Sequence, residues 1–178
     1  MLKAYKYRLY PTDEQKVLFA KTFGCCRFVY NWGLSLKISA YKEKKETLSN
    51  IYITNLMRSE LKSKNEWLKE VNSQSLQSAL RNLDAAYSKF FQNSKAVGFP
   101  KYKSRKDRQS FQCPQHCSVD FSSSTISIPK AKSIPAILHR KFTGKIKTVT
   151  ISMNPSGRYF ASVLVETNIA ECPVSEIK

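Results

Sequence analysis

The sequence is poor in acidic residues, and this scarcity excludes one large class of enzyme. Only 13 of its 178 residues are Asp or Glu, against 30 Lys and Arg, so the formal net charge is +17. The acids are scattered, with no Asp-x-Asp or Asp-x-x-Glu cluster. Nucleases that use two metal ions need several carboxylates to hold them. A metal-dependent nuclease centre is therefore not expected among these residues.

Histidines and paired cysteines are also few. The two histidines, His116 and His139, have no recognisable pairing with a nucleophile and an orienting carboxylate. The five cysteines form no Cys-x-x-Cys pair. Cys113 and Cys117, which flank His116, offer fewer than the four ligands that structural zinc takes, and the other cysteines, including Cys172, are expected in different elements. There is no glycine-rich phosphate loop. We therefore expect no catalytic residue, no metal site and no cofactor in this chain.

Targeting and membrane segments are missing as well. No apolar segment follows Met1, and no hydrophobic run approaches the length of a membrane span. The odd number of cysteines argues against a disulfide framework. These features predict a cytoplasmic protein with no membrane partner.

Positive charge is abundant, and it is interleaved with aromatic rings. A net charge this high usually serves to meet a polyanion, and nucleic acid is the leading partner. Tyr7, Arg8 and Tyr10 combine rings with charge near the start, and Lys101 and Tyr102 do so in the middle. Stacking plus phosphate neutralisation is typical of single-strand binding. The alternatives are a merely basic surface and rings that mostly belong to the core.

The first half of the chain predicts one strand and then helices. Residues 3–10 alternate as a strand, which Pro11 ends. Thr12 and Gln15 form a capping box, so a helix should run to about residue 23, with Gly24 as its end. A second helix is expected over 25–44, which suggests a helix-turn-helix at first sight. A third helix should run from about 50 to 63, and a fourth should start at residue 73, with an apolar face that continues to Phe91.

The second half predicts short strands. A basic loop covers 98–108, and strand patterns follow at 110–113, 119–121, 125–128, 137–140, 145–152 and 159–165. Between Asp120 and Glu166 there are seven Lys and Arg and no acid. The expected fold class is α+β: a small antiparallel barrel, interrupted after its first strand by a helical bundle.

A series of motifs in a fixed order resembles a known family. The motifs are Arg8-Leu9-Tyr10-Pro11, Gly24-Cys25-Cys26-Arg27-Phe28-Val29-Tyr30-Asn31, Trp67-Leu68-Lys69-Glu70-Val71, Leu76-Gln77, Leu83-Asp84-x-Ala86-Tyr87, Gly98-Phe99-Pro100-Lys101-Tyr102-Lys103, Gly144-Lys145-Ile146-Lys147 and Gly157-x-Tyr159. Their order and spacing resemble the N-terminal half of TnpB, a protein family of bacterial insertion sequences related to the type V CRISPR effectors.

The resemblance implies an architecture and partners. The first strand (1–10) and residues 96–168 would form the wedge barrel, which is OB-like. Residues 11–95 would be a helical recognition insert, and 169–178 a tail. The first two helices then need not read DNA as a helix-turn-helix. Family members bind a guide RNA from the transposon end and double-stranded target DNA, where the protein reads a short motif and base pairing reads the rest. This implies a nucleoid-associated protein of a bacterium or archaeon.

The family's nuclease half would begin roughly where the sequence ends. The resemblance therefore implies a natural truncation, an engineered fragment or one half of a split protein. Any Mg²⁺ would belong to the nuclease half, and a C-terminal nuclease fragment is a possible partner. The alternatives are a stand-alone DNA-binding repressor and the recognition half of an active nuclease.

The resemblance also implies which residues meet nucleic acid. The motif beside the target would be read by Ser73, Gln74 and Gln77, together with Gln115 and His116 on a facing loop. Gln77 is the best candidate because a Gln amide can bind adenine through two hydrogen bonds; the alternative is a solvent-facing helix residue. Tyr30 and Asn31 would either meet nucleic acid or tie the helices together. Phosphate contacts are expected from Arg8, Arg27, Lys101, Lys103, Arg105, Lys106, Arg108, Arg140, Lys141, Lys145 and Lys147.

Overall fold

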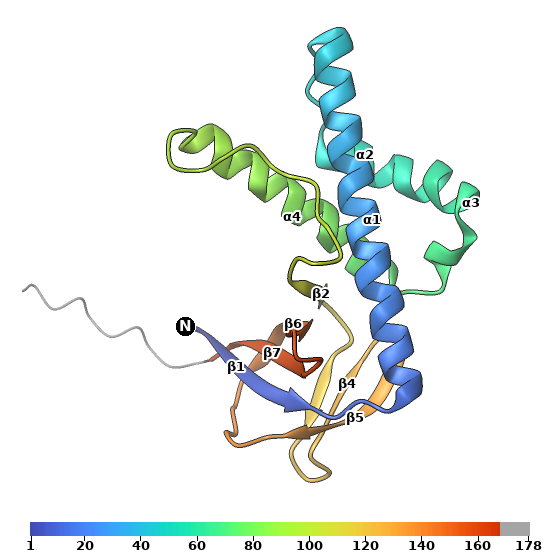
Figure 1. Cartoon of the computed structure of the whole chain (residues 1–178). Helices are drawn as coiled ribbons and strands as arrows, with labels where there is room; N and C mark the ends of the chain where they lie inside the picture. The colour runs from blue at the N-terminus through green and yellow to red at the C-terminus, as the bar shows by residue number, and fades with distance from the viewer. Residues whose placement is uncertain (168–178) are drawn as a thin grey trace, which may run out of the picture.

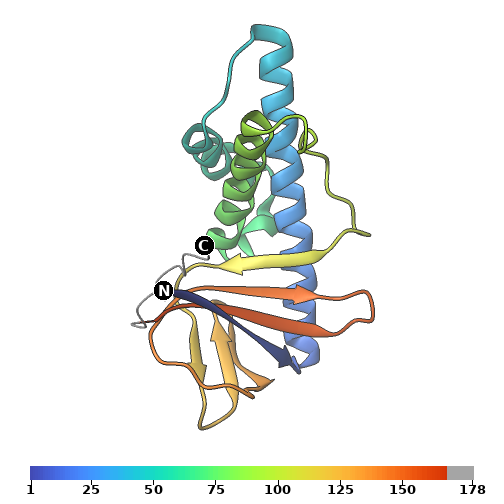
Figure 2. The ribbon, with the colours of Figure 1, turned by 90° about the vertical axis from the view of Figure 1, so that its left-hand side faces the viewer.

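The fold has a helical half that stands on one antiparallel sheet (Figures 1 and 2). A computed structural model describes residues 1–167. Within that range, every helix lies in the sequence between the first strand, β1 (Leu2–Leu9), and the second, β2 (Gln109–Cys113). Figure 2 shows the longest helix rising from the sheet to the opposite end of the molecule. The mixed helix-and-sheet class expected from the sequence is confirmed.

The longest helix, α1 (Asp13–Lys44), is continuous, which corrects the expected break at Gly24. Its start is as predicted: the Thr12 hydroxyl accepts a hydrogen bond from the Gln15 amide, and the Gln15 side chain accepts one from the Thr12 amide. Buried side chains lie on both sides of Gly24, among them Phe23 and Cys25. A glycine inside a helix costs only about 1 kcal/mol. Packing on both sides outweighs that cost, so no helix-turn-helix forms within residues 13–44.

The remaining helices are close to their expected ranges. The third predicted helix is a continuous helical run made of α2 (Asn50–Leu56), a π-helical turn η1 (Met57–Leu61) and α3 (Lys62–Lys64). A 3₁₀ turn, η2 (Glu66–Lys69), precedes α4 (Ser73–Gln92). Of the two residues that the sequence offers as a cap for this helix, Asn72 and Ser73, the structure uses Asn72: its side chain accepts a hydrogen bond from the Gln74 amide at 3.2 Å.

The apolar face of α4 is buried over only part of its length. Leu76, Leu80 and Leu83 are fully buried. The predicted face continues to Phe91, but 72% of Phe91 is exposed. The expectation that the whole face packs inward is therefore wrong for the last turns, which extend beyond α1 and the sheet (Figure 1).

The strands form one sheet in the order β2-β6-β7-β1-β5-β4-β3, with antiparallel neighbours throughout. The strands predicted at 119–121 and 125–128 are confirmed and pair as an antiparallel hairpin, and the last two predicted strands are confirmed as well. The prediction of a strand at 137–140 is wrong, because the strand in this region, β5, runs over Ala131–Ile137 and ends where the predicted one begins. Pro135 argued against a strand here because proline has no amide donor. Its carbonyl nevertheless accepts a hydrogen bond from the Tyr10 amide at 2.8 Å. The strands after β2 are β3 (Ser118–Asp120), β4 (Thr125–Ile128), β5 (Ala131–Ile137), β6 (Lys145–Met153) and β7 (Tyr159–Glu166).

The sheet is open, so the expected closed barrel is not confirmed. Among residues 1–167, β2 and β3 each pair with one neighbour only and form the two edges. An OB-like topology is likewise not established. The domain boundaries proposed from the sequence stay predictions, and the tail expected at 169–178 lies outside the described residues.

The helices and the sheet share one hydrophobic core. From α1, the rings of Phe19 and Phe23 pack against Phe111 of β2, with centroids 5.8 and 5.4 Å apart. Higher on α1, Gly33 faces α4 at close range. A Cβ atom placed on Gly33 would lie 2.8 Å from Leu80 Cδ2 and 3.1 Å from Leu83 Cδ2. The absence of a side chain at Gly33 is therefore what allows α1 and α4 to approach this closely.

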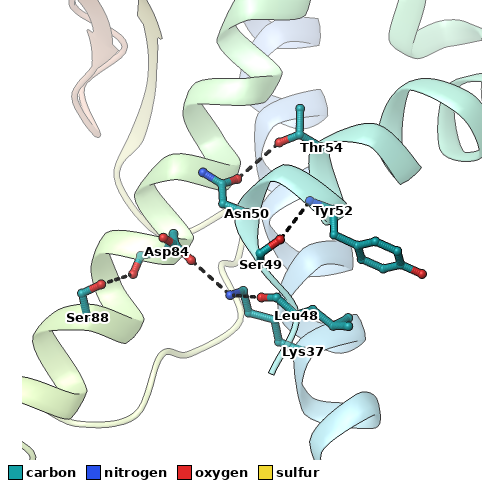
Figure 3. Close-up of polar contacts among 8 residues, drawn as sticks. All are labelled: Lys37, Leu48, Ser49, Asn50, Tyr52, Thr54, Asp84 and Ser88. Atoms are coloured by element: carbon teal, nitrogen blue, oxygen red, sulfur yellow. Dashed lines mark hydrogen bonds and ion pairs between the residues drawn. The ribbon is translucent and has the colours of Figure 1, made fainter. Parts of the chain in front are cut away.

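A nearly buried lysine ties three helices together (Figure 3). Lys37 of α1, whose side chain is 10% exposed, donates to the Asp84 carboxylate of α4 at 3.1 Å. It also donates to the Leu48 carbonyl at 2.8 Å, just before the Ser49 cap of α2. Its ammonium lies 5.1 Å from the centre of the Tyr87 ring. Lys37 thereby fixes α4 and the start of α2 relative to α1.

This contact predicts an asymmetric mutational response. Asp84→Ala should destabilise the fold by about 1–3 kcal/mol, because it leaves a buried ammonium with one acceptor. Lys37→Met should cost less, since it removes the buried charge and leaves a half-exposed carboxylate. Urea unfolding of both variants and the double variant measures this. Asp13→Ala, which breaks an exposed ion pair with Lys16, is the control and should change nothing measurable. A double variant as unstable as the sum of the singles would contradict this coupling.

Candidate nucleic-acid interface

A polar cleft lies where the helical half meets the sheet. It is bounded by α1, α4, strand β2 and the basic loop that precedes β2. Three of the predicted phosphate-binding residues, Arg27, Lys103 and Arg108, line this cleft, although they come from two distant parts of the chain. Amide side chains line it as well: Asn82 of α4, and Gln109 and Gln112 of β2. The cleft thus combines positive charge with hydrogen-bonding groups.

The upper end of the basic loop is fastened to α1 by Asn31. The Asn31 amide group donates to the Lys103 carbonyl at 2.9 Å, and its oxygen accepts from the Lys103 amide at 2.8 Å. The Lys103 ammonium lies 4.0 Å from the centre of the Tyr30 ring. Partial burial lowers the pKa of Lys103. Of the two roles expected for Tyr30 and Asn31, the structure shows contacts within the protein, to the loop.

The lower end of the loop is closed on itself. The Asp107 carboxylate accepts a hydrogen bond from the Ser104 amide at 2.6 Å. The Gln109 side chain donates to the carbonyls of Arg105 and Asp107 at 2.9 and 2.6 Å and accepts from Arg27 at 3.1 Å. The loop is therefore held at both ends. Its remaining basic side chains, Lys101, Arg105, Lys106 and Arg108, are exposed.

The predicted motif-reading residues fall into two groups. Gln74 of α4 and Gln115 meet directly, with Gln74 Nε2 donating to Gln115 Oε1 at 2.7 Å. Gln74 Oε1 is buried and accepts no hydrogen bond from residues 1–167. His116 is exposed beside Gln115, with a left-handed backbone (φ 57°). Ser73, also exposed, accepts a hydrogen bond from Lys62 at 2.6 Å.

Gln77 lies one turn after Ser73 on α4 and lines a different part of the surface. It lines a polar hollow between α2 and α4, together with Asn50, Asn55, Arg58 and Arg81. This hollow is rich in Asn, Gln and Arg, the side chains that most often bind base edges. The five predicted readers are therefore distributed over the first turns of α4 and the loop that holds Gln115 and His116, and their reading role stays a prediction. The residues from α2 were missed because their proximity to Gln77 depends on how two helices cross.

The other basic residues lie on the far part of the sheet. Arg8 of β1 packs over the rings of Phe160 and Tyr10, at 5.2 and 5.4 Å from their centres, and Lys6 lies 4.6 Å from the centre of Phe160. Arg140 lines a hollow beside the start of β1. Lys147 pairs with Glu166 at 3.1 Å, while Lys141 and Lys145 are exposed. Lys6 and Phe160 were missed, although the alternation of Lys6 and Arg8 along β1 places both on one face.

The thiols of Cys25 and Cys26 are weak acids in their buried positions. Burial raises the pKa of Cys25 to about 11, and burial likewise raises the pKa of Cys26. A thiol with a raised pKa is a poor nucleophile at neutral pH because little thiolate is present. Within residues 1–167, no group of three or more His, Cys, Asp or Glu could hold a metal ion. Cys172 lies outside the described residues.

Charge and hydrogen-bonding groups line this surface, and both suit it to contacts with a polyanion. Over the described range, no helix is both long and apolar enough to cross a bilayer.

Known proteins match nearly the whole chain. A "Putative RNA-guided DNA endonuclease" from Streptomyces pristinaespiralis is 33% identical over 178 residues, covering 97% of this chain and 44% of that protein. "Putative RNA-guided DNA endonuclease InsQ" from Escherichia coli K12 is 31% identical over 175 residues, covering 95% of this chain and 42% of that protein. "Virulence protein VsdF" from Salmonella dublin is 35% identical over 111 residues, covering 58% of this chain and 93% of that protein. The chain belongs to the TnpB family of insertion-sequence proteins.

This TnpB-family chain spans less than half the length of the two endonuclease-named relatives. A family model described as a helix-turn-helix domain also matches residues 1–46. In the structure that range holds β1, the unbroken α1 and the first residues after it. This chain therefore matches the helix-turn-helix family model although its structure has no turn between residues 13 and 44.

Proposed function

We propose that this chain is the nucleic-acid-recognition module of a TnpB-like protein. It binds a guide RNA derived from a transposon end and a short DNA motif beside the target. In this proposal the chain does not cleave by itself and needs no cofactor. Cleavage, and the Mg²⁺ for it, belong to a nuclease half, which acts as a partner segment.

The observation that carries the proposal is the basic cleft at the junction of helices and sheet. Arg27, Lys103 and Arg108 converge there, beside a loop that is held at both ends. Phosphate contacts of this kind position a nucleic acid, while base contacts specify its sequence. The paired Gln74 and Gln115 and the hollow lined by Gln77 offer amide side chains that can contact bases along the first turns of α4. The names of the RNA-guided relatives support the same partners.

A second candidate is a stand-alone DNA-binding repressor. The match of residues 1–46 to a helix-turn-helix family model favours it. The two functions differ in whether the protein needs RNA to find a DNA sequence.

Purification with bound nucleic acid tests both proposals. The chain is produced in cells that also carry the adjoining transposon end, and the bound nucleic acid is extracted, sized and treated with ribonuclease. One RNA of defined length, protected by the protein, is expected. Tight sequence-specific binding to duplex DNA after complete removal of RNA would instead establish the repressor. Binding to neither RNA nor DNA would contradict both.

Gln77→Ala should relax the DNA-motif preference at one position. Loss of a two-hydrogen-bond contact to a base removes about 1–3 kcal/mol of discrimination. The measurement is selection of bound duplexes from a pool in which the bases beside the target are randomised. Gln92→Ala, the same substitution at the exposed far end of α4, is the matched control and should leave the preference unchanged. An unchanged preference in Gln77→Ala would remove Gln77 from the reading surface.

A further inference from the structure

The far end of α4 carries a group of exposed aromatic rings that the junction cleft does not use. Phe91, on the last turn, is 72% exposed, and Tyr102, on the returning loop, is 56% exposed. The last turns of α4 extend beyond α1 and the sheet (Figure 1). Tyr102 directly precedes Lys103, whose backbone is hydrogen-bonded to Asn31 of α1, and it lies close enough to Tyr87 to add to the effect of burial in raising the pKa of that phenol. Large apolar side chains gathered on a surface usually mark a binding site. We call Tyr87, Phe90, Phe91, Phe99 and Tyr102 the aromatic tip.

Four rings of the aromatic tip, Tyr87, Phe90, Phe91 and Phe99, pack against one another before any ligand binds. Phe99 packs edge-on against both Tyr87 and Phe90, with ring centres 5.4 and 5.5 Å apart. These contacts attach the returning loop to the helix, and the hydrogen bonds of Asn31 to Lys103 attach it to α1 a few residues later. Phe91 leans on Tyr87 in a stacked arrangement, with centres 6.1 Å apart and planes inclined by 29°. A surface preformed in this way loses little conformational entropy on binding.

The exposure of Phe91 is not explained by the fold. The loop is held to the helix by Phe99. Phe91 contacts only two rings of its own helix, Tyr87 in a stacked and Phe90 in a tilted arrangement. An exposed phenylalanine at this position is costly to keep in water, and a polar residue would complete the helix equally well. Phe91 therefore points to a ligand with a flat apolar surface.

The charge around the aromatic tip selects the kind of ligand. Between Asp84 and Asp107 the chain has no acidic residue and six basic ones, Lys89, Lys95, Lys101, Lys103, Arg105 and Lys106. A second apolar protein surface would not require this one-sided charge. A polyanion that also carries flat apolar groups does match it. Unpaired nucleotides have both features, since bases stack on aromatic side chains while phosphates meet lysines.

We propose that the aromatic tip binds unpaired nucleotides, with Phe91 and Tyr102 as stacking platforms for bases and the neighbouring lysines as phosphate contacts. This inference rests on the proposed nucleic-acid-binding function and adds a site for the single-stranded part of the ligand. Paired bases are stacked within a duplex and cannot reach the rings. The aromatic tip should therefore discriminate by strandedness, whereas the basic loop should not.

The test compares binding of a 20-nucleotide oligouridylate with that of a 20-base-pair DNA duplex of arbitrary sequence, using Phe91→Leu, Tyr102→Leu and the double variant. Each substitution keeps the apolar character and removes the ring. We expect about a tenfold loss of oligouridylate affinity for each ring, and duplex affinity within about twofold of wild type. The salt dependence of binding should not change, because no charge is removed. Phe91→Trp should retain full affinity, and Val17→Ala, at an exposed apolar residue of α1 (57% exposed), should have no effect.

Several results would overturn this proposal. Phe91→Leu and Tyr102→Leu could leave oligouridylate binding intact, or could weaken duplex binding equally. Sedimentation could instead show that wild type self-associates through the aromatic tip and that Phe91→Leu is monomeric, which would make the occupant a second copy of this chain. If wild type binds neither probe, the proposed nucleic-acid function fails together with this one. If wild type binds both probes but the ring variants behave like wild type, only the aromatic tip is refuted.

Discussion

Replacing Gly33 by valine should destabilise the protein by about 2–4 kcal/mol, because overpacking a core contact forces side chains and backbone apart. The added Cβ would lie 2.8 Å from Leu80 and 3.1 Å from Leu83, and both leucines are fully buried. They cannot move aside without displacing their own neighbours in the core. For a domain of this size the loss corresponds to a melting temperature lower by roughly 10 °C. Thermal and urea unfolding measure it.

Gly24→Ala is the matched control for that experiment. A Cβ at Gly24 would meet no atom within 4 Å, and Gly24 lies in the same helix. Alanine should therefore stabilise the protein by about 0.5–1 kcal/mol, the usual gain from replacing glycine inside a helix. The two substitutions should change the free energy of unfolding in opposite directions, although both replace a glycine of the same helix. Comparing them distinguishes the effect of packing from that of helix propensity. Equal stability of Gly33→Val and wild type would show that α1 and α4 do not approach each other as described.

Removing three charges from the basic loop should weaken nucleic-acid binding about a hundredfold near 0.1–0.2 M salt, whatever the sequence bound. The variant is Lys101→Ala combined with Arg105→Ala and Lys106→Ala. Lys103 is left intact because its ammonium is packed on Tyr30 and its backbone holds the loop. If each of the three side chains neutralises one phosphate, the slope of log K against log salt should become shallower by about 2–3. Titrations at four or more salt concentrations measure both quantities.

The control for the loop variant removes the same charge elsewhere. Lys42 and Lys44 at the far end of α1 and Lys64 of α3 are exposed and distant in sequence from the loop. Their triple alanine variant lowers the net charge equally and should retain most of the affinity and the slope. If both triple variants lose affinity alike, net charge rather than this loop governs binding.

Local signals in the sequence predicted the starts of the helices well. The Thr12–Gln15 capping box and the Asn72 cap each depend on residues within one turn, so their chemistry can be read directly. The alternation over 145–152 and 159–165 located β6 and β7 for the same reason. The errors arose where packing outweighed a local signal. Gly24 suggested a helix end, but buried neighbours keep α1 intact, and Pro135 concealed a strand that pairs through its carbonyl.

The candidate site was harder to predict than the fold because it is assembled from distant segments. Composition identified the basic loop, but not that Arg27 would face it through Gln109. The apolar period placed Phe91 with the buried residues, although α4 extends beyond its neighbours before that turn. Asn50 and Asn55 come to lie beside Gln77 through the crossing of α2 and α4, which no short pattern contains. At each of these positions the sequence shows the residue type. It does not show which of these residues lie together in space.

The pairing of β1 with β7 has a consequence for the order in which the chain can fold. Leu2 is the register partner of Glu166, so the first strand made during synthesis must wait for the last described strand before their ladder can form. The helices between them contact one another and need no residue beyond α4 for those contacts. Contacts of such large sequence separation form slowly. We therefore expect the helical half to form while synthesis continues, whereas β1 and β6 can each gain a second neighbour only after β7 is made.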